Sequence, residues 1–243
     1  MPRFARLALL VLAASVNQPT ALLAQASPLV PLDDPHLPFI EYLITRGDLA
    51  DPSPFLRPFR RDEIRSLLQA ADAQAGTPSG AMIGALQTTF SDPDGKRWWR
   101  VKGRAGVQLF SDARRDPLHP AGPGGLEPYA DLQLSGVVGP ALAVVRPAFE
   151  PRIEDDPDWT GGRNLSVPGR FVEAYVGAQF RWVSLYFGRL DRNWGPLPVA
   201  GIPISNYGYG RPGFDLEIRT RDFSLSALAS DLQDQTEDRK SVV

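Results

Sequence analysis

Apolar and polar residues alternate with a period of two over most of the chain from residue 99 onward. Successive side chains of a β-strand point to opposite faces, so this spacing predicts strands with one apolar and one polar face. In 99–109, for example, the odd positions are mainly apolar and the even positions mainly polar. The same pattern predicts seven strands, at 99–109, 129–138, 141–149, 171–180, 183–187, 214–219 and 223–230.

The connections between these strands alternate in length. Tight links are expected at 139–140, 181–182 and 220–222, and long polar loops at 111–128, 153–169 and 190–213. Short turns on one side and long loops on the other are typical of outer-membrane β-barrels. Most of the strands also have about the length that a tilted membrane strand needs, roughly 9 to 11 residues.

The polar face carries charges of both signs, as a wet or ion-paired barrel lumen would. The residues predicted to face the lumen are Arg100, Lys102, Arg104, Arg146, Glu150, Arg152 and Glu173. Aromatic residues lie near strand ends, where an interfacial girdle would place them: Trp98, Trp99, Tyr129, Phe149, Phe171, Phe180, Trp182 and Phe187. A soluble β-sandwich also alternates, but these two features favour the membrane barrel.

Residues before 96 follow a different period. Apolar residues at helical spacing predict three short helices. The first ends at Gly47, the second follows Pro58 and closes at Gly76, and the third is capped by Ser79. We expect 27–95 to form a helical periplasmic subdomain, either a plug or partner-docking module or a plain structural cap.

The first 26 residues read as a secretory signal peptide. Arg3 and Arg6 precede an apolar run at 7–14, and the small residues of Ala24-Gln25-Ala26 fit a cleavage site. The sequence therefore predicts export to the bacterial outer membrane, with 96–232 as a partial barrel. The polar tail 233–243 is either native or an artefact of translated adapter sequence.

Composition narrows the chemistry. The 243 residues include no Cys, so disulfides, thiolate zinc sites and Cys nucleophiles are excluded. The net charge of −2 lacks the excess of basic residues that is typical of nucleic-acid-binding proteins. His36 and His119 match no zinc or catalytic motif, and the acidic cluster at 154–156 and 158 lacks the order of a calcium loop. We expect no catalytic residue, metal or cofactor, and therefore no enzyme.

One loop has the composition of a sugar-binding site. Aromatic rings stack on sugar faces, while Asn, Asp and Arg bind hydroxyls and carboxylates, which suits an acidic polysaccharide. The alternative is a loop that folds into the barrel and satisfies its own polar groups. The candidate residues are Arg189, Asp191, Arg192, Asn193, Trp194, Asn206, Tyr207, Tyr209 and Arg211.

Two regions resemble the capsule assembly protein Wzi family. The C-terminal region comprises Gly188 to Pro196, Ile204-Ser205-Asn206 and Arg211-Pro212. The N-terminal region comprises Val30-Pro31-Leu32-Asp33, the helix up to Gly47, Arg57-Pro58-Phe59 and Leu67-Leu68. The resemblance implies an outer-membrane lectin that helps tether or assemble surface polysaccharide, with outer-membrane lipid and the polysaccharide export machinery as partners. The matching positions are Arg189, Asn193, Trp194, Ser205, Asn206 and Arg211.

The chain departs from that family in two ways. Trp194 stands alone where the family often has a Trp pair, and family barrels have about eighteen strands, more than these residues supply. Because no open edge survives in lipid, we expect an N-terminal fragment of a larger barrel. The alternatives are a complete small barrel, either a porin-like channel or a membrane-embedded hydrolase, and a soluble secreted β-sandwich that binds sugars.

Overall fold

The structure of the chain is a computed structural model that describes residues 25–71, 76–91, 98–111, 124–156, 159, 161, 168–197, 199, 201, 204, 209–220 and 222–230. The predicted signal peptide, apart from its last two residues, and the tail 233–243 lie outside the described residues. So do His119, Asp158 and Ser205.

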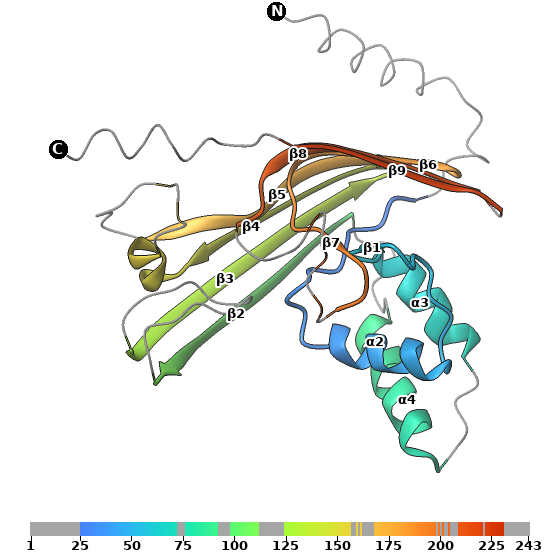
Figure 1. Cartoon of the computed structure of the whole chain (residues 1–243), viewed down its shortest axis with the longest axis horizontal. Coiled ribbons are helices and arrows are strands. Elements are labelled where there is room, and N and C mark those ends of the chain that lie inside the picture. The colour runs from blue at the N-terminus through green and yellow to red at the C-terminus, as the bar shows by residue number, and fades with distance from the viewer. Residues whose placement is uncertain are drawn as a thin grey trace, which may run out of the picture.

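The main element is one antiparallel sheet of seven strands (Figure 1). Its order is β2-β3-β4-β5-β6-β8-β9, so each strand lies beside the one that precedes it in the chain apart from the short β7. This confirms a mainly β fold with the seven predicted strands. The sheet is not closed: in the described part of the chain, β2 and β9 are its two edges. The bounds are β2 Trp99–Phe110, β3 Gly125–Val138, β4 Ala141–Phe149, β5 Gly169–Gln179, β6 Val183–Arg189, β8 Pro212–Arg219 and β9 Ser224–Ser230.

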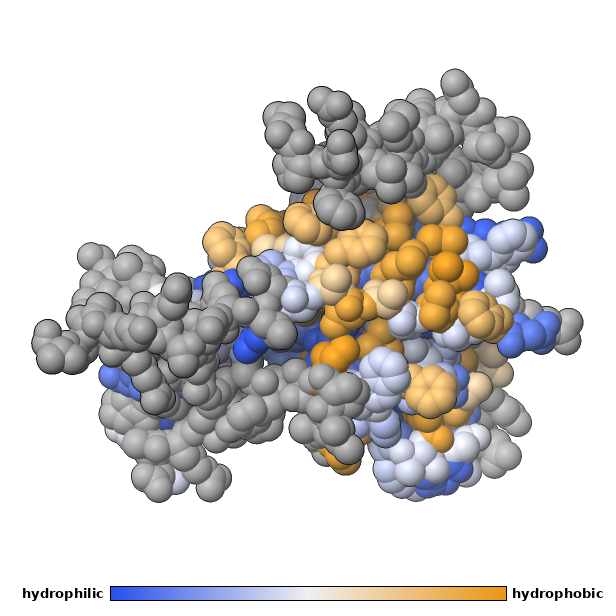
Figure 2. All heavy atoms as spheres, turned by 45° about the horizontal axis from the view of Figure 1, so that its top comes forward, coloured by the Kyte–Doolittle hydropathy of each residue, from blue (hydrophilic) through white to orange (hydrophobic). Residues whose placement is uncertain are grey.

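The two faces of the sheet have opposite character. Apolar side chains lie on the face that is open to the surroundings, which we call the exposed face: Leu109 is 79% and Phe187 63% exposed. Figure 2 shows hydrophobic residues gathered over this part of the molecule. Charged and polar side chains lie on the opposite, covered face, where Glu173 is 2% and Arg146 3% exposed. In a water-soluble sheet this arrangement would be reversed.

Two predictions about the strands were wrong in detail. The predicted loop 111–128 is shorter, because Gly125 to Pro128 continue β3 and pair with 107–110 of β2. Alternation within 171–180 puts Val172 on the same side as Ala174, Val176 and Ala178 and so predicts it on the exposed face, but Val172 is buried. The register between β4 and β5 shifts at Arg146/Pro147, so β5 carries one extra residue there, and Val172 turns to the covered side.

The helices lie beside the covered face, below the sheet in Figure 1. They are α2 (Leu37–Arg46), α3 (Arg61–Ala70) and α4 (Pro78–Phe90), and they share an apolar core that includes Leu37, Ile64 and Phe90. No helix in the described ranges is long and apolar enough to cross a bilayer.

The helix ends match the predictions in part. Gly47 ends α2 in the left-handed region, at φ 83°. However, α3 ends at Ala70 instead of Gly76. The cap of α4 is Thr77, whose hydroxyl accepts a hydrogen bond from the Gly80 amide, so the prediction of Ser79 was wrong.

Candidate functional site

The covered face is lined along its middle by the chain's own N-terminal segment, residues 25–34. The Ser27 amide donates to Oε1 of Gln179 at 2.7 Å, and Nε2 of Gln179 donates back to the Ser27 carbonyl at 2.7 Å. The Leu29 amide donates to the Tyr175 hydroxyl at 3.2 Å. Apolar contacts join the same segment to β4, β5 and β6, through Ala26, Leu29, Leu142, Val144, Tyr175 and Tyr186. This segment therefore occupies part of the space that faces the sheet.

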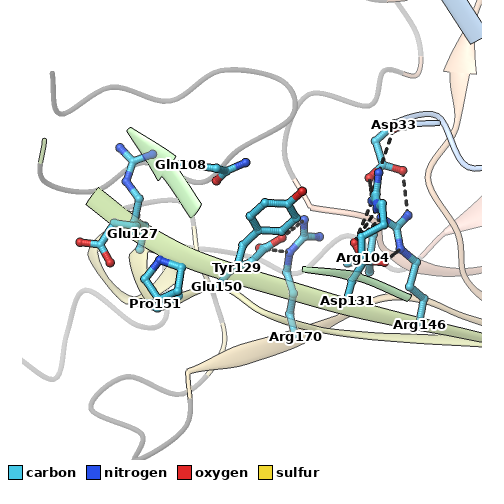
Figure 3. Close-up of a pocket in the computed structure, with 13 residues that line it drawn as sticks. Asp33, Arg104, Gln108, Glu127, Tyr129, Asp131, Arg146, Glu150, Pro151 and Arg170 are labelled. Carbon is cyan, nitrogen blue, oxygen red and sulfur yellow. Dashed lines mark hydrogen bonds and ion pairs between the residues drawn. The ribbon is translucent and has the colours of Figure 1, made fainter. Parts of the chain in front are cut away.

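A four-residue ion cluster fixes the end of this segment (Figure 3). Arg146 donates to both carboxylate oxygens of Asp33, at 2.7 and 2.6 Å, and to both oxygens of Asp131, at 3.2 and 3.1 Å. Arg104 donates to Asp33 at 2.6 Å and to Asp131 at 2.9 Å. Each carboxylate is thus shared by two guanidinium groups, and bidentate pairs of this kind are geometrically specific.

A cavity of about 110 Å³ opens beside this cluster, toward the strand ends that carry the long loops. Arg170 donates to Glu150 at 2.8 Å in its wall. The guanidinium of Arg152 lies 3.3 Å from the ring centre of Phe110, at the end of β2. Tyr129 and Gln108 also line the cavity (Figure 3). The wall therefore combines ion pairs with aromatic and amide groups.

The residues predicted to face a lumen are found as follows. Arg104, Arg146, Glu150 and Arg152 line the cavity. Glu173 is buried and accepts from Gln133 at 2.9 Å. Lys102 lies 3.7 Å from Asp34, and Arg100 shares the polar side of β2 with it.

Sequence reasoning missed Asp33 and Arg170 as members of this face. Asp33 lies 71 residues from Arg104 and 113 from Arg146, so no local pattern links them. Arg170 precedes the bulge in β5. It therefore lies on the same side as Glu173, whereas strict alternation would place these two residues on opposite sides.

Most described residues of the predicted sugar-binding loop interact within the protein. Arg192 forms a buried ion pair with Asp215. Asn193 is fully buried, and its amide donates to the carbonyls of Gly195 and Val199 at 2.9 and 3.0 Å. The Tyr209 hydroxyl donates to Asp156. Burial raises the pKa of Asp191 to about 6. Arg189 is half-buried and Arg211 exposed, whereas Asn206 and Tyr207 lie outside the described residues.

Trp194 differs from these residues because it is 42% exposed. Its ring lies beside that of Phe55, with centres 6.5 Å apart. We call Phe55 and Trp194 the aromatic pair. Trp194 belongs to a small second sheet, in which β1 (Leu56–Arg57) pairs with β7 (Asn193–Trp194), and Phe55 directly precedes β1. The two stretches on which the family resemblance rests therefore meet here, through Arg57 and Asn193, which are 136 residues apart in the chain.

Buried charges hold this second sheet to the helices. Arg57 is fully buried and donates to Glu41 at 2.6 and 3.0 Å and to Asp51 at 3.1 Å. The Leu197 amide donates to the same Glu41 at 3.3 Å. The loop after β6 is thus fastened to α2, and the aromatic pair is held on a supported backbone.

Among the described residues, no group of three or more His, Asp or Glu side chains is placed to hold a metal ion. No family model, curated protein or solved structure matches the chain.

Proposed function

We propose that the seven strands are part of an outer-membrane β-barrel, and that the protein binds surface polysaccharide without being an enzyme. The observation that carries this proposal is the inversion of the sheet, with apolar residues on the exposed face and ion pairs on the covered face. A lipid bilayer stabilises such an exposed apolar face, because the lipid chains remove the apolar side chains from water.

The height of the apolar face supports a membrane location. On β2 its exposed apolar side chains run from Trp99 to Leu109. The ten steps from residue 99 to residue 109, at about 3.3 Å each, span about 33 Å along the strand. A strand tilted by about 40° then covers about 25 Å of the bilayer, which is the height of the apolar band of such barrels.

The ends of the sheet support an orientation. Trp98, Trp99 and Trp182 are exposed at the end with the tight turns, where a membrane interface would favour them. By analogy with known barrels the tight turns face the periplasm. The helices would then lie on the periplasmic side, since Arg219 at that end of β8 contacts Glu63 of α3 at 2.5 Å.

The covered face favours a barrel whose lumen is filled by protein over a porin-like channel with an open lumen. Residues 25–34 lie against it, Arg192 of the loop after β6 pairs with Asp215 of β8, and Arg104 and Arg146 pair with Asp33 and Asp131. A soluble sandwich is disfavoured by the apolar exposed face, and a hydrolase by the absence of a catalytic motif in the sequence. The resemblance to the capsule assembly protein Wzi family adds the substrate class, a surface polysaccharide, and the export machinery as a partner.

The aromatic pair is the best-supported contact point for the polysaccharide. It is exposed, rigidly backed by β1 and β7, and large enough to stack on sugar rings.

The proposal is tested by binding of purified surface polysaccharide to the detergent-refolded chain. Replacing Trp194 by Ala should weaken binding about tenfold, corresponding to roughly 1.4 kcal/mol. The matched control is Trp182→Ala, which removes an exposed ring from the tight turn between β5 and β6 and should leave affinity unchanged. Equal affinities for all three proteins would remove Trp194 from the site. Recovery of the protein in the periplasm or medium, and not in the outer membrane, would count against the barrel.

A further inference from the structure

The cavity beside the ion cluster is lined by two kinds of polar side chain (Figure 3). The residues of the ion cluster and the Arg170–Glu150 pair bond to one another. At the loop ends of β2 and β3, the wall carries the hydroxyl of Tyr129, the amide of Gln108 and the carboxylate of Glu127. Within the described part of the chain, none of these three groups has a hydrogen-bond or ion-pair partner. We call Gln108, Glu127 and Tyr129 the polar patch.

The polar patch is held by two neighbouring strands. Gln108 of β2 lies directly across from Glu127 of β3, and Tyr129 lies across from Gly106. A Cβ at Gly106 would come within 2.9 Å of the Tyr129 ring, so the glycine lets this ring lie against the backbone of β2. Tyr129 shares one side of β3 with Asp131 and lines the cavity, so the prediction that it belongs to an interfacial girdle was wrong.

The three groups suit a ligand with several hydroxyls. A carboxylate accepts hydrogen bonds, whereas an amide and a phenol hydroxyl both donate and accept them. An aromatic ring adds a face on which C–H groups can stack. A pyranose ring presents hydroxyls around its edge and C–H groups on its faces, so it meets both requirements.

An inorganic anion fits the polar patch less well than a sugar does. The carboxylate of Glu127 would repel it. The guanidinium groups of Arg104, Arg146 and Arg170, which could attract it, already bind carboxylates.

The size of the cavity limits the ligand to one ring. The volume of the cavity is about 110 Å³. A cavity of about 150 Å³ holds a benzene ring, and sites for drug-sized ligands measure about 300 Å³ or more. One pyranose ring, inserted part of the way, therefore fits, whereas a longer stretch of sugar chain does not.

From the unpartnered groups, the aromatic ring and the size of the cavity, we propose that the polar patch binds a single pyranose ring of the polysaccharide. The sugar would stack on Tyr129, and its hydroxyls would bond to Gln108, Glu127 and the Tyr129 hydroxyl. This inference rests on the proposed function and adds a second contact to that of the aromatic pair. In the proposed orientation the long loops face the cell exterior, so the polar patch opens toward the surface on which the polysaccharide lies.

Isothermal titration calorimetry on the detergent-refolded full chain tests the inference. The probes are short oligosaccharides made by partial hydrolysis of the purified surface polysaccharide. Tyr129→Phe and Gln108→Leu each remove one proposed hydrogen bond to the sugar and should weaken binding about fivefold. The matched control is Tyr42→Phe, since Tyr42 lies on α2 and is 48% exposed; this variant should bind as the parent does.

Stability separates a binding role from a structural one. The Tyr129 hydroxyl and the Gln108 amide have no hydrogen-bond partner in the described ranges, so their loss should not lower the urea midpoint of the free protein. A fall of the midpoint in both variants, in parallel with the fall in affinity, would overturn the inference.

A thiol in the polar patch locates the bound ring. The chain has no Cys, so Gln108→Cys gives one reactive position. At an oligosaccharide concentration of about ten times the dissociation constant, alkylation of this thiol by iodoacetamide should slow about tenfold. The matched control is Ser226→Cys on the polar side of β9, which should react at the same rate with and without the oligosaccharide.

The outcomes separate this inference from the proposed function. The inference alone is refuted if the oligosaccharides bind and Trp194→Ala weakens their binding, while the variants of Tyr129 and Gln108 bind as the parent does and the Gln108→Cys thiol is not protected. If neither the oligosaccharides nor the intact polysaccharide binds the parent, the proposed function fails and the inference fails with it.

Discussion

Replacing Asp33 by Asn should release the N-terminal segment from the covered face. Asn has nearly the same shape as Asp, so the change removes charge and leaves no cavity. Arg104 and Arg146 would then share the single carboxylate of Asp131. The Arg146 side chain is only 4% exposed, so water cannot replace the lost partner there.

The size of the effect follows from these exposures. Removing one partner of a fully buried ion pair costs about 3–5 kcal/mol, and an exposed pair contributes less than about 1 kcal/mol. Asp33 is 30% and Arg104 38% exposed, and Asp131 remains as a second acceptor. We therefore expect a loss of about 2 kcal/mol in the free energy of unfolding.

Urea unfolding in detergent micelles, followed by Trp fluorescence at pH 7, measures this loss. The matched control is Asp48→Asn, because Asp48 is 29% exposed, close to the 30% of Asp33, but its partner Arg46 is 46% exposed; this change should cost about 0.5 kcal/mol or less. A double-mutant cycle of Asp33→Asn with Arg146→Gln should give a coupling of at least about 1 kcal/mol. Two results would refute the reasoning: an Asp33→Asn variant no less stable than the control, or a coupling below about 0.3 kcal/mol.

Two further predictions concern the segment around the end of β6. Gly188 has a φ of 130°, and a Cβ there would lie 2.2 Å from the carbonyl oxygen of Ala174. Gly188→Ala should therefore lower the free energy of unfolding, measured in urea, by about 3 kcal/mol. The control is Gly84→Ala in α4, where a Cβ has open space, and it should raise the free energy of unfolding by about 0.5 kcal/mol. Unfolding of Gly188→Ala at the parent's urea midpoint would contradict this. Because the pKa of Asp191 is raised to about 6, its ionised form opposes folding, so stability should rise by about 1–2 kcal/mol as pH falls from 7 to 4.5. Asp191→Asn should make that rise smaller by about 1–2 kcal/mol and be more stable than the parent at pH 8; a rise of unchanged size in the variant would contradict the assignment to Asp191.

The strands were predictable because the period of two is a local property. Val101, Val107 and Leu109 share one side of β2 whatever the rest of the chain does. The start of β3 was not predictable in this way, since Gly125 and Pro128 are ordinary turn residues. They form a strand because β2 continues far enough to pair with them.

The candidate site was predictable only in part. Alternation placed Arg104, Arg146 and Glu173 on one polar side. Their partners come from other elements, and Asp33 in particular lies in a segment without a strand or helix pattern. The covering of the polar face by residues 25–34 depends on contacts between residues more than 100 positions apart, such as Ser27 with Gln179 and Asp33 with Arg146, and sequence spacing does not encode them.

The residues of the family resemblance separate into two kinds once the structure is considered. Arg57 and Asn193 pair across β1 and β7 and are fully buried, and their polar groups bond within the protein. They hold the loop to the helices and have no surface left for a ligand. Trp194 follows Asn193 directly, so its side chain points the opposite way and reaches solvent. Within β1 and β7 the motif thus combines positions that build the loop with an exposed ring, that of Trp194, to which the proposed function assigns polysaccharide contact. Loss of Asn193 should therefore lower stability and binding together, whereas loss of Trp194 should lower binding alone.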